Sequence, residues 1–168
     1  MEKLKKFLIE NIYSINRCKI HIGKYLVNDK DLIFDKKISR ERFDSLLSKF
    51  VCSKYSVKKE KIYNYKNYFY NINNNEAYRI TNNYVFDIKD NSMFVETYTK
   101  EDINYTKFSC KKDYDNIYDY ELTQISLAPE LQLNFVCEKG FYTFTIEINI
   151  DSNIDNSLKK LESLLTLI

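Results

Sequence analysis

Charged side chains recur at every second position in runs of the sequence that have the pattern of β-strands. The run "RCKIHI" (17–22) places Arg17, Lys19 and His21 on one face and three apolar side chains on the other. The run "GFYTFTIEINI" (140–150) has a single carboxylate, Glu147, on a face that otherwise carries small polar side chains. These spacings indicate strands with one apolar face and one face that carries charge.

Such groups support two kinds of chemistry if their faces converge. Asp119 and Glu121 of "YDYELT" (118–123), together with Glu147, would supply three carboxylates on two strands, which can bind magnesium or manganese. Cations next to those acids oppose metal binding and would contact an anionic ligand or form salt bridges with the acids. We therefore expect either a binding site or a mutual salt-bridge network.

Other catalytic arrangements are not indicated. The chain has no glycine-rich phosphate loop and no serine or cysteine nucleophile motif, and His21 is its one histidine. The four cysteines are far apart and show no C-x-x-C spacing, so we expect no zinc site and reduced thiols in an intracellular protein.

The elements that would position these groups follow from periodicity. Apolar residues at helical spacing predict helices over about 2–15, 40–52 and 156–168, the second with Ser39 as its N-cap. The run "CKIHIGKYLV" (18–27), which follows Arg17, predicts a strand between the first two helices. Runs of aromatic and β-branched residues from 61 to 150, including a hairpin around Lys139 and Gly140, predict a succession of antiparallel strands.

The alternation fits two architectures. A one-sided sheet with its polar face in water is the first, and a closed barrel with a polar lumen is the second. Three amphipathic helices need an apolar sheet surface to cover, which favours the barrel. We predict an α+β fold, an antiparallel tunnel-like β-barrel with helices packed outside, whose lumen collects Arg17, Lys19, His21, Lys107, Ser109, Asp119, Glu121, Thr123 and Glu147.

Composition limits the class of protein. The 168 residues are consistent with a single domain spanning 1–168, and a net charge of +2 gives no general signal for nucleic acid. The N-terminal run lacks the features of a signal peptide and no stretch approaches a membrane span. We expect a soluble, cytoplasmic protein with no membrane partner.

Several motifs in order resemble the RNA triphosphatases of viral and fungal mRNA capping, in the triphosphate tunnel metalloenzyme superfamily. The likeness runs from about 16 to 150. Gly23 with the "IS...FDSLL" helix start matches the family's first strand, loop and helix; "AYRI" puts Arg79 in a basic position. "YTKFSC" has Lys107 where the family has arginine, "YDYELT" resembles Tyr-Arg-Ile-Asp-Leu-Thr, and "YTFTIEI" keeps Glu147 of a three-glutamate strand.

The departures from the family concern its metal site. The resemblance implies a divalent cation held by glutamates of the first and last strands, yet Arg17, Lys19, Thr143 and Thr145 stand in four of those positions. Replacing two carboxylates by two cations changes the local charge by about four units, so we expect no metal there. Glu147 is expected to pair with Arg17 and Lys19.

Three hypotheses follow. The first is a degenerate triphosphatase-like domain, a pseudoenzyme without a cofactor that binds a protein partner in a viral capping or transcription apparatus. In a variant of it, Arg17, Lys19, His21, Arg79 and Lys107 contact the phosphates of an RNA 5′ end. The second is an active, magnesium- or manganese-dependent RNA 5′-triphosphatase using Glu147, Glu121 and Asp119. The third is an α+β scaffold whose exposed tyrosines contact other proteins.

Overall fold

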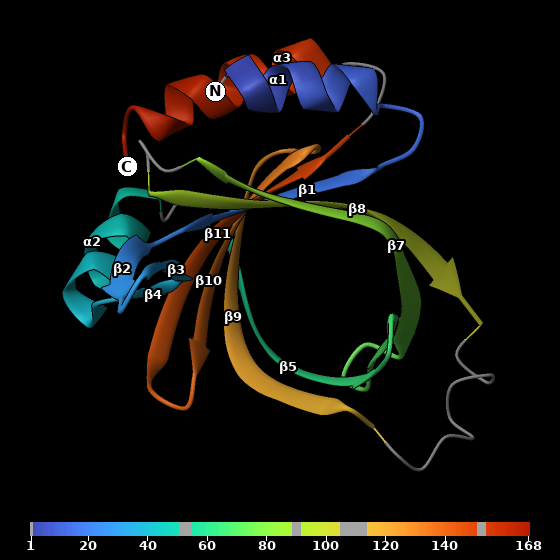
Figure 1. Ribbon diagram of the computed structural model, residues 1–168. Coiled ribbons are helices and arrows are strands. Elements are labelled where there is room, and N and C mark those ends of the chain that lie inside the picture. The colour runs from blue at the N-terminus through green and yellow to red at the C-terminus, as the bar shows by residue number, and fades with distance from the viewer. Residues whose placement is uncertain (1, 51–54, 89–91, 105–113, 151–153) are drawn as a thin grey trace.

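The computed structural model describes residues 2–50, 55–88, 92–104, 114–150 and 154–168 (Figure 1). Its helices are α1 (Glu2–Glu10), α2 (Arg40–Phe50) and α3 (Ile154–Leu165). Its strands are β1 (Arg17–Ile22), β2 (Lys24–Asn28), β3 (Asp31–Asp35), β4 (Lys37–Ile38), β5 (Tyr55–Tyr65), β6 (Tyr68–Asn71), β7 (Glu76–Ile88), β8 (Met93–Ile103), β9 (Asn116–Ala128), β10 (Leu131–Glu138) and β11 (Phe141–Asn149).

A closed antiparallel barrel forms the centre of the molecule. Within the described residues, eight strands follow one another in the order β1-β8-β7-β6-β5-β9-β10-β11, and β11 pairs back with β1. The short strand β4 pairs with β11 where β1 has ended. The prediction of a tunnel-like barrel with external helices is therefore confirmed.

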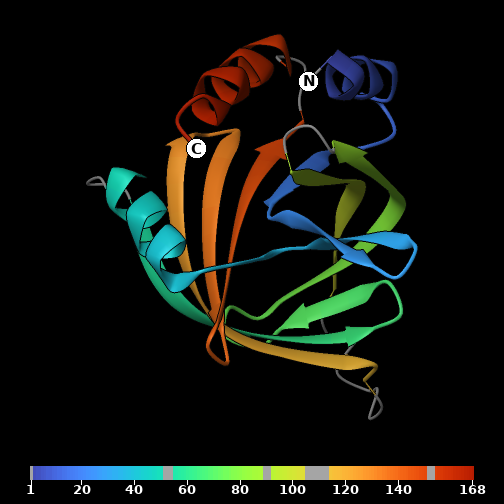
Figure 2. The same cartoon turned by 60° about the vertical axis from the view of Figure 1, so that its left-hand side comes forward.

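The helices cover one part of the outer barrel surface. Figure 1 shows α1 and α3 side by side above β1 and β8, while α2 lies on a different side, near β4. Leu4 and Leu8 of α1 and Leu161 of α3 share one apolar core with outward-facing strand residues such as Ile20 and Ile146. Figure 2, turned by 60°, shows that the lower part of the barrel, formed by β5 and its neighbours, has no helix over it.

Local sequence accounts for most element boundaries. Ser39 caps α2, because its side-chain oxygen accepts a hydrogen bond from the Arg42 amide at 3.2 Å. Lys139 and Gly140 both have positive φ, 49° and 81°, as a tight β-hairpin turn between antiparallel strands requires. The first helix is shorter than predicted, since α1 ends at Glu10 and a turn follows.

The first predicted strand is interrupted at Gly23. β1 ends at Ile22, and β2 forms a separate hairpin with β3. A Cβ atom at Gly23 would overlap the carbonyl oxygen of Asp35 and lie 2.7 Å from the Phe34 ring. Only glycine permits this close approach where the hairpin leaves the barrel.

No helix in the described part of the chain has both the length and the apolar character needed to cross a membrane.

Candidate functional site

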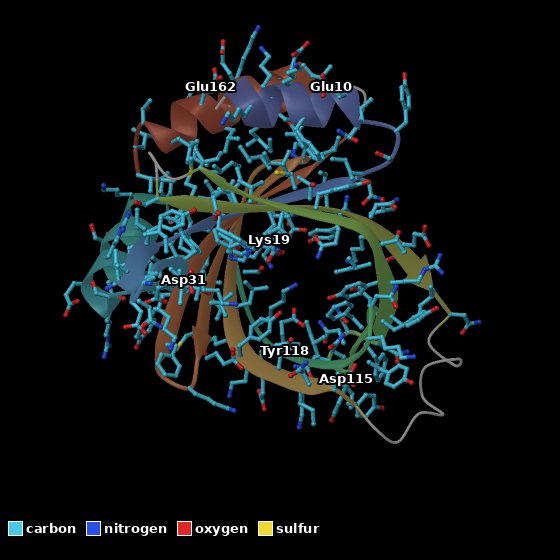
Figure 3. The ribbon with its side chains drawn as sticks, viewed as in Figure 1. Glu10, Lys19, Asp31, Asp115, Tyr118 and Glu162 are labelled. Atoms are coloured by element: carbon cyan, nitrogen blue, oxygen red, sulfur yellow. The ribbon has the colours of Figure 1, made fainter. Side chains whose placement is uncertain are left out.

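The lumen of the barrel carries the charged faces of β1 and β11. In the register of this pair Lys19 lies opposite Glu147 and His21 opposite Thr145. Because Cys18, Ile20 and Ile146 are in the outer core, the alternate side chains of both strands face inward. Figure 3 shows Lys19 pointing toward the barrel interior, whereas Glu10 and Glu162 point away from the outer faces of α1 and α3.

Both oxygens of Glu147 have partners in this wall. Arg17 Nε lies 3.9 Å from Oε1, and the Asn134 amide donates a hydrogen bond of 3.1 Å to Oε2. Asn134 is itself fixed, because its oxygen accepts a hydrogen bond of 2.9 Å from Gln124 Nε2. Of the two cations expected to pair with Glu147, Arg17 forms the ion pair.

Lys19 lies between two acids. On the other side of β1, its register partner on β8 is Glu96, whose Oε2 lies 3.2 Å from His21 Nε2. Burial would raise the pKa of Glu96, but the contact with His21 and the positive charges of Lys19 and Lys36 lower it below its ordinary value. Glu96 therefore stays ionised among cations.

A second ion pair lies on the opposite side of the lumen. Glu60 of β5 is 3% exposed; Lys58 Nζ lies 3.0 Å from its Oε1, and the Asn71 amide donates to its Oε2. Sequence reasoning missed this pair as well as Glu96. Alternation in "MFVETYTKEDI" (93–103) would have identified Glu96, because it shares a face with Tyr98 and Lys100.

Three phenols also face the lumen, from β7, β8 and β9. Burial raises the pKa values of Tyr78, Tyr98 and Tyr120, and the negative charge of Glu147 raises each of them further. Protonated phenols can donate hydrogen bonds to anionic or carbonyl oxygens. Lys100 Nζ lies 4.4 Å from the centre of the Tyr78 ring, a cation–π contact.

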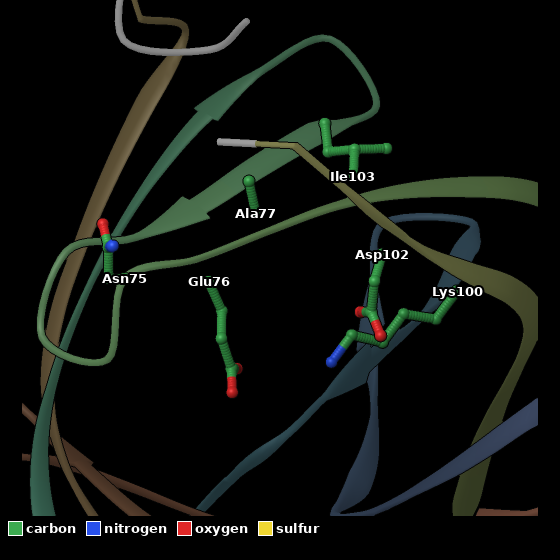
Figure 4. Close-up of a pocket in the computed structure, with 6 residues that line it drawn as sticks. All are labelled: Asn75, Glu76, Ala77, Lys100, Asp102 and Ile103. Atoms are coloured by element: carbon green, nitrogen blue, oxygen red, sulfur yellow. The ribbon is translucent and has the colours of Figure 1, made fainter. Parts of the chain in front are cut away.

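One rim of the barrel contains a cavity of about 400 Å³. It is lined by Asn75, Glu76, Ala77, Lys100, Asp102 and Ile103 (Figure 4). The charged side chains of the lining are Glu76 of β7 and Lys100 and Asp102 of β8. The charged part of the cavity lining therefore has more carboxylates than cations.

Three predicted site residues lie elsewhere. Asp119 and Glu121 face outward, opposite Lys61 and Lys59 of β5, because Ile125 of the same strand packs in the outer core and side chains alternate from it. The predicted inward position of Thr123 is wrong for the same reason.

Arg79 also faces outward. Its register partner on β8 is Glu101, and Arg79 Nε donates a hydrogen bond of 3.2 Å to the Glu101 carboxylate. Lys107 and Ser109 lie outside the described residues. Of the predicted site residues, the structure thus brings together Arg17, Lys19, His21 and Glu147, and it does not bring Asp119, Glu121 or Arg79 to them.

The lumen carboxylates do not fit a divalent metal ion. Arg17 forms an ion pair with Glu147, and Lys19 lies opposite Glu147 and Glu96 in the registers of the two neighbouring strands. In the described part of the chain no three His, Cys, Asp or Glu side chains are grouped as metal ligands. The constellation of Asp119, Glu121 and Glu147 is divided between the outside and the inside of the barrel, so it forms no rearranged metal site.

Comparison with known proteins supports the fold. No protein-family model matches the chain, and no curated protein matches it. Among solved structures, the chain is similar to the S. pombe RNA triphosphatase Pct1, solved in complex with the Spt5 CTD. The TM-score is 0.54 at 9% sequence identity, over 96% of this chain and 84% of that chain. The chain therefore has an RNA triphosphatase-like barrel fold.

Proposed function

We propose that this barrel has lost the metal-dependent activity of its fold and works by binding, as a non-catalytic partner subunit of an mRNA capping or transcription apparatus encoded by a virus. The fold comparison supports the link to RNA triphosphatases, and the resemblance of the motifs to viral and fungal capping systems supports the apparatus. The contacts that Glu147 makes in the lumen support the proposed loss of activity.

The observation that carries the proposal is the closed network around Glu147. Its two oxygens are engaged by Arg17 and Asn134, and Lys19 lies opposite it in register. A divalent cation at this place would have to displace Arg17 and approach Lys19, and like charges at such distances repel strongly in a partly desolvated lumen. Without the metal, a triphosphate would have neither charge neutralisation nor a positioned water.

The charge of the lumen favours a protein partner over an RNA 5′ end. By the strand registers, inward-facing cations are Arg17, Lys19, Lys37, Lys58 and Lys100, and inward-facing acids are Glu60, Glu76, Asp87, Glu96, Asp102, Glu138 and Glu147. The described part of the lumen thus has more carboxylates than fixed cations. A polyphosphate would meet net repulsion there. Pct1 was solved with a protein peptide, and for this chain we likewise propose a protein partner.

Hydrolysis of 5′-triphosphate RNA tests the loss of activity. The purified chain is incubated with the RNA and either Mg²⁺ or Mn²⁺, and released phosphate is measured by malachite green. We expect wild type and Glu147→Ala to release phosphate at the same background rate. Metal-dependent turnover that Glu147→Ala abolishes would overturn the proposal.

Fluorescence anisotropy with metal-free RNA tests the class of partner. Two labelled RNAs of one sequence are compared, with a 5′-triphosphate and with a 5′-hydroxyl. We expect no preference between them. The proposal of a protein partner would be wrong if the 5′-triphosphate RNA binds more tightly and Lys19→Gln weakens that binding. The partner would then be an RNA 5′ end.

A further inference from the structure

The base of the β2–β3 hairpin contacts side chains that face the lumen. Tyr25 and Phe34 lie opposite each other in register, and their ring centroids are 5.2 Å apart. Phe34 stacks on Phe94 of β8 with centroids 5.5 Å apart, and the Tyr25 hydroxyl donates a hydrogen bond of 2.7 Å to Asp87 Oδ1. Phe94 and Asp87 are register partners on the inner face of the barrel. The hairpin is thus attached to the end of the lumen.

This attachment covers one mouth of the barrel. Figure 2 shows the hairpin in front of the barrel strands. Beneath it, the His21 ring contacts Phe94 edge to face, with centroids 5.9 Å apart. His21 is only 7% exposed although it lies near the end of β1, and Thr145, its register partner on β11, is 3% exposed. The aromatic rings therefore separate the end of the lumen from solvent.

The covered mouth contains a buried polar pair, His21 and Thr145. Within the described residues, neither His21 Nδ1 nor Thr145 Oγ1 has a hydrogen-bond partner. An unpaired polar atom is less favourable in a protein interior than in water, where it is hydrated. Covering the mouth therefore carries a free-energy cost that is relieved whenever the mouth opens.

The rest of the hairpin is weakly connected to the barrel. Within the described residues, β2 pairs with β3 alone and β3 with β2 alone. Every residue from 26 to 33 is exposed. A single residue outside any strand joins each end of the hairpin to the barrel, Gly23 after β1 and Lys36 before β4. Segments with few buried contacts open more easily than the core, and residues at element ends can act as hinges.

We propose that the β2–β3 hairpin is a lid on this mouth of the barrel. Tyr25 and Phe34 hold it closed, and it opens about Gly23 and Lys36 while the barrel stays folded. Opening exposes the buried polar pair to solvent and to any ligand that enters at this end.

The lid restricts how the lumen is reached. The rim cavity of about 400 Å³ lies at the opposite ends of β7 and β8, so it stays accessible when the lid is closed. An extended chain can pass through the barrel only while the lid is open. The inference goes beyond the proposed function, because neither a protein partner nor the loss of the metal site requires a lid.

Acylation of His21 by diethyl pyrocarbonate measures how often the mouth is open. His21 is the chain's one histidine, and peptide mass spectrometry identifies its modified form. We expect wild type to react more slowly than a free peptide with the sequence of 17–23. Tyr25→Phe should react about tenfold faster than wild type, because it removes a hydrogen bond to a charged group. Tyr13→Phe, in the exposed turn after α1, is the matched control and should react as wild type does.

Urea distinguishes opening of the lid from unfolding of the whole chain. Opening of the hairpin exposes little surface, so the wild-type rate should depend only weakly on urea below the unfolding transition. Leu161→Ala removes a fully buried side chain of α3 and lowers global stability, but it should leave the acylation rate unchanged. Thermal unfolding checks that all variants fold.

Three results would overturn the lid. If wild-type His21 reacts as fast as the free peptide, the mouth is not closed. If Tyr25→Phe reacts no faster than wild type, Tyr25 does not hold the hairpin. If Leu161→Ala accelerates acylation as much as Tyr25→Phe does, or the urea dependence equals that of global unfolding, the hairpin does not open by itself.

Discussion

The outer and inner faces of β1 and β11 differ in what they contact and in what they do. On the outside Cys18, Ile20, Ile146 and Ile148 are fully buried against helices and neighbouring strands. On the inside Arg17, Lys19 and Glu147 remain partly exposed; Arg17 forms an ion pair with Glu147, and Lys19 lies opposite Glu147 in register. The outer face therefore supplies most of the stability, while the inner face can change its chemistry without loss of the fold. This separation allows a barrel to keep its architecture while the charges of its lumen change.

Adjacent residues of β11 should show the largest contrast between the faces. Ile146→Ala removes a fully buried outer side chain and should lower the free energy of unfolding by about 2–5 kcal/mol, through lost burial and a cavity. Thr145→Val changes the inner face. It replaces a buried hydroxyl that has no hydrogen-bond partner among the described residues, so its effect should be within about 1 kcal/mol of zero or stabilising.

Urea unfolding of both variants measures this contrast. Similar losses of stability in Ile146→Ala and Thr145→Val would mean that the two faces contribute equally, and the comparison would fail.

The buried ion pair of β5 should show the largest effect among lumen residues. Glu60→Gln leaves Lys58 without its partner and disturbs the contact with Asn71, so it should cost about 1–3 kcal/mol. Glu101→Gln is the matched control, because its partner Arg79 is on the exposed outer surface and such pairs are worth about 0–1 kcal/mol. Urea unfolding measures the loss of unfolding free energy in both variants. A larger loss for Glu101→Gln than for Glu60→Gln would mean that the charges outside the lumen contribute more to stability than those inside it.

A double-mutant cycle of Arg17→Met and Glu147→Gln should give a smaller coupling. The 3.9 Å ion pair is partly hydrated and Glu147 keeps its hydrogen bond from Asn134, so we expect a coupling energy of about 0.5–1 kcal/mol. Chemical denaturation of the four chains gives this value. A coupling energy of zero would show that Arg17 does not neutralise Glu147 in solution.

The smallest effect should be a pH dependence from Glu96. Its pKa is lowered in the folded protein, so its contribution to stability is present above the ordinary glutamate value of about 4.3 and is lost as pH falls through the lower folded value. Wild type should therefore lose more stability than Glu96→Gln between pH 6 and pH 3. If the unfolding free energies of wild type and Glu96→Gln fall equally between pH 6 and pH 3, the pKa of Glu96 is not lowered in the folded protein.

The barrel could be predicted because two patterns agree. The alternation of 141–150 gives a strand with one apolar face, and three amphipathic helices require that face to be covered. The same alternation places Arg17, Lys19, His21 and Glu147 in the lumen. The residues that alternate with them are apolar and must face the outer core, so the charged side chains must face inward.

The rest of the lumen could not be assigned with the same certainty from alternation. In "KKEK" (58–61) every residue is charged, so alternation does not reveal that Lys58 and Glu60 face inward while Lys59 and Lys61 face outward. Asp119 and Glu121 alternate with Tyr118 and Tyr120, and tyrosine suits either face. The helices do not cover this part of β9, so no outer core determines which of its alternate side chains face outward. That choice is determined further along the strand, where Ile125 packs in the outer core.

Manganese binding to the purified chain tests the central claim most directly. Titration with Mn²⁺, followed by the loss of the free-ion electron paramagnetic resonance signal, compares wild type with the double variant Arg17→Glu/Lys19→Glu. We expect no binding above background for wild type, and binding by the variant, because its substitutions convert two repelling cations into two carboxylates beside Glu147. Stoichiometric binding of Mn²⁺ by wild type that Glu147→Ala abolishes would contradict it.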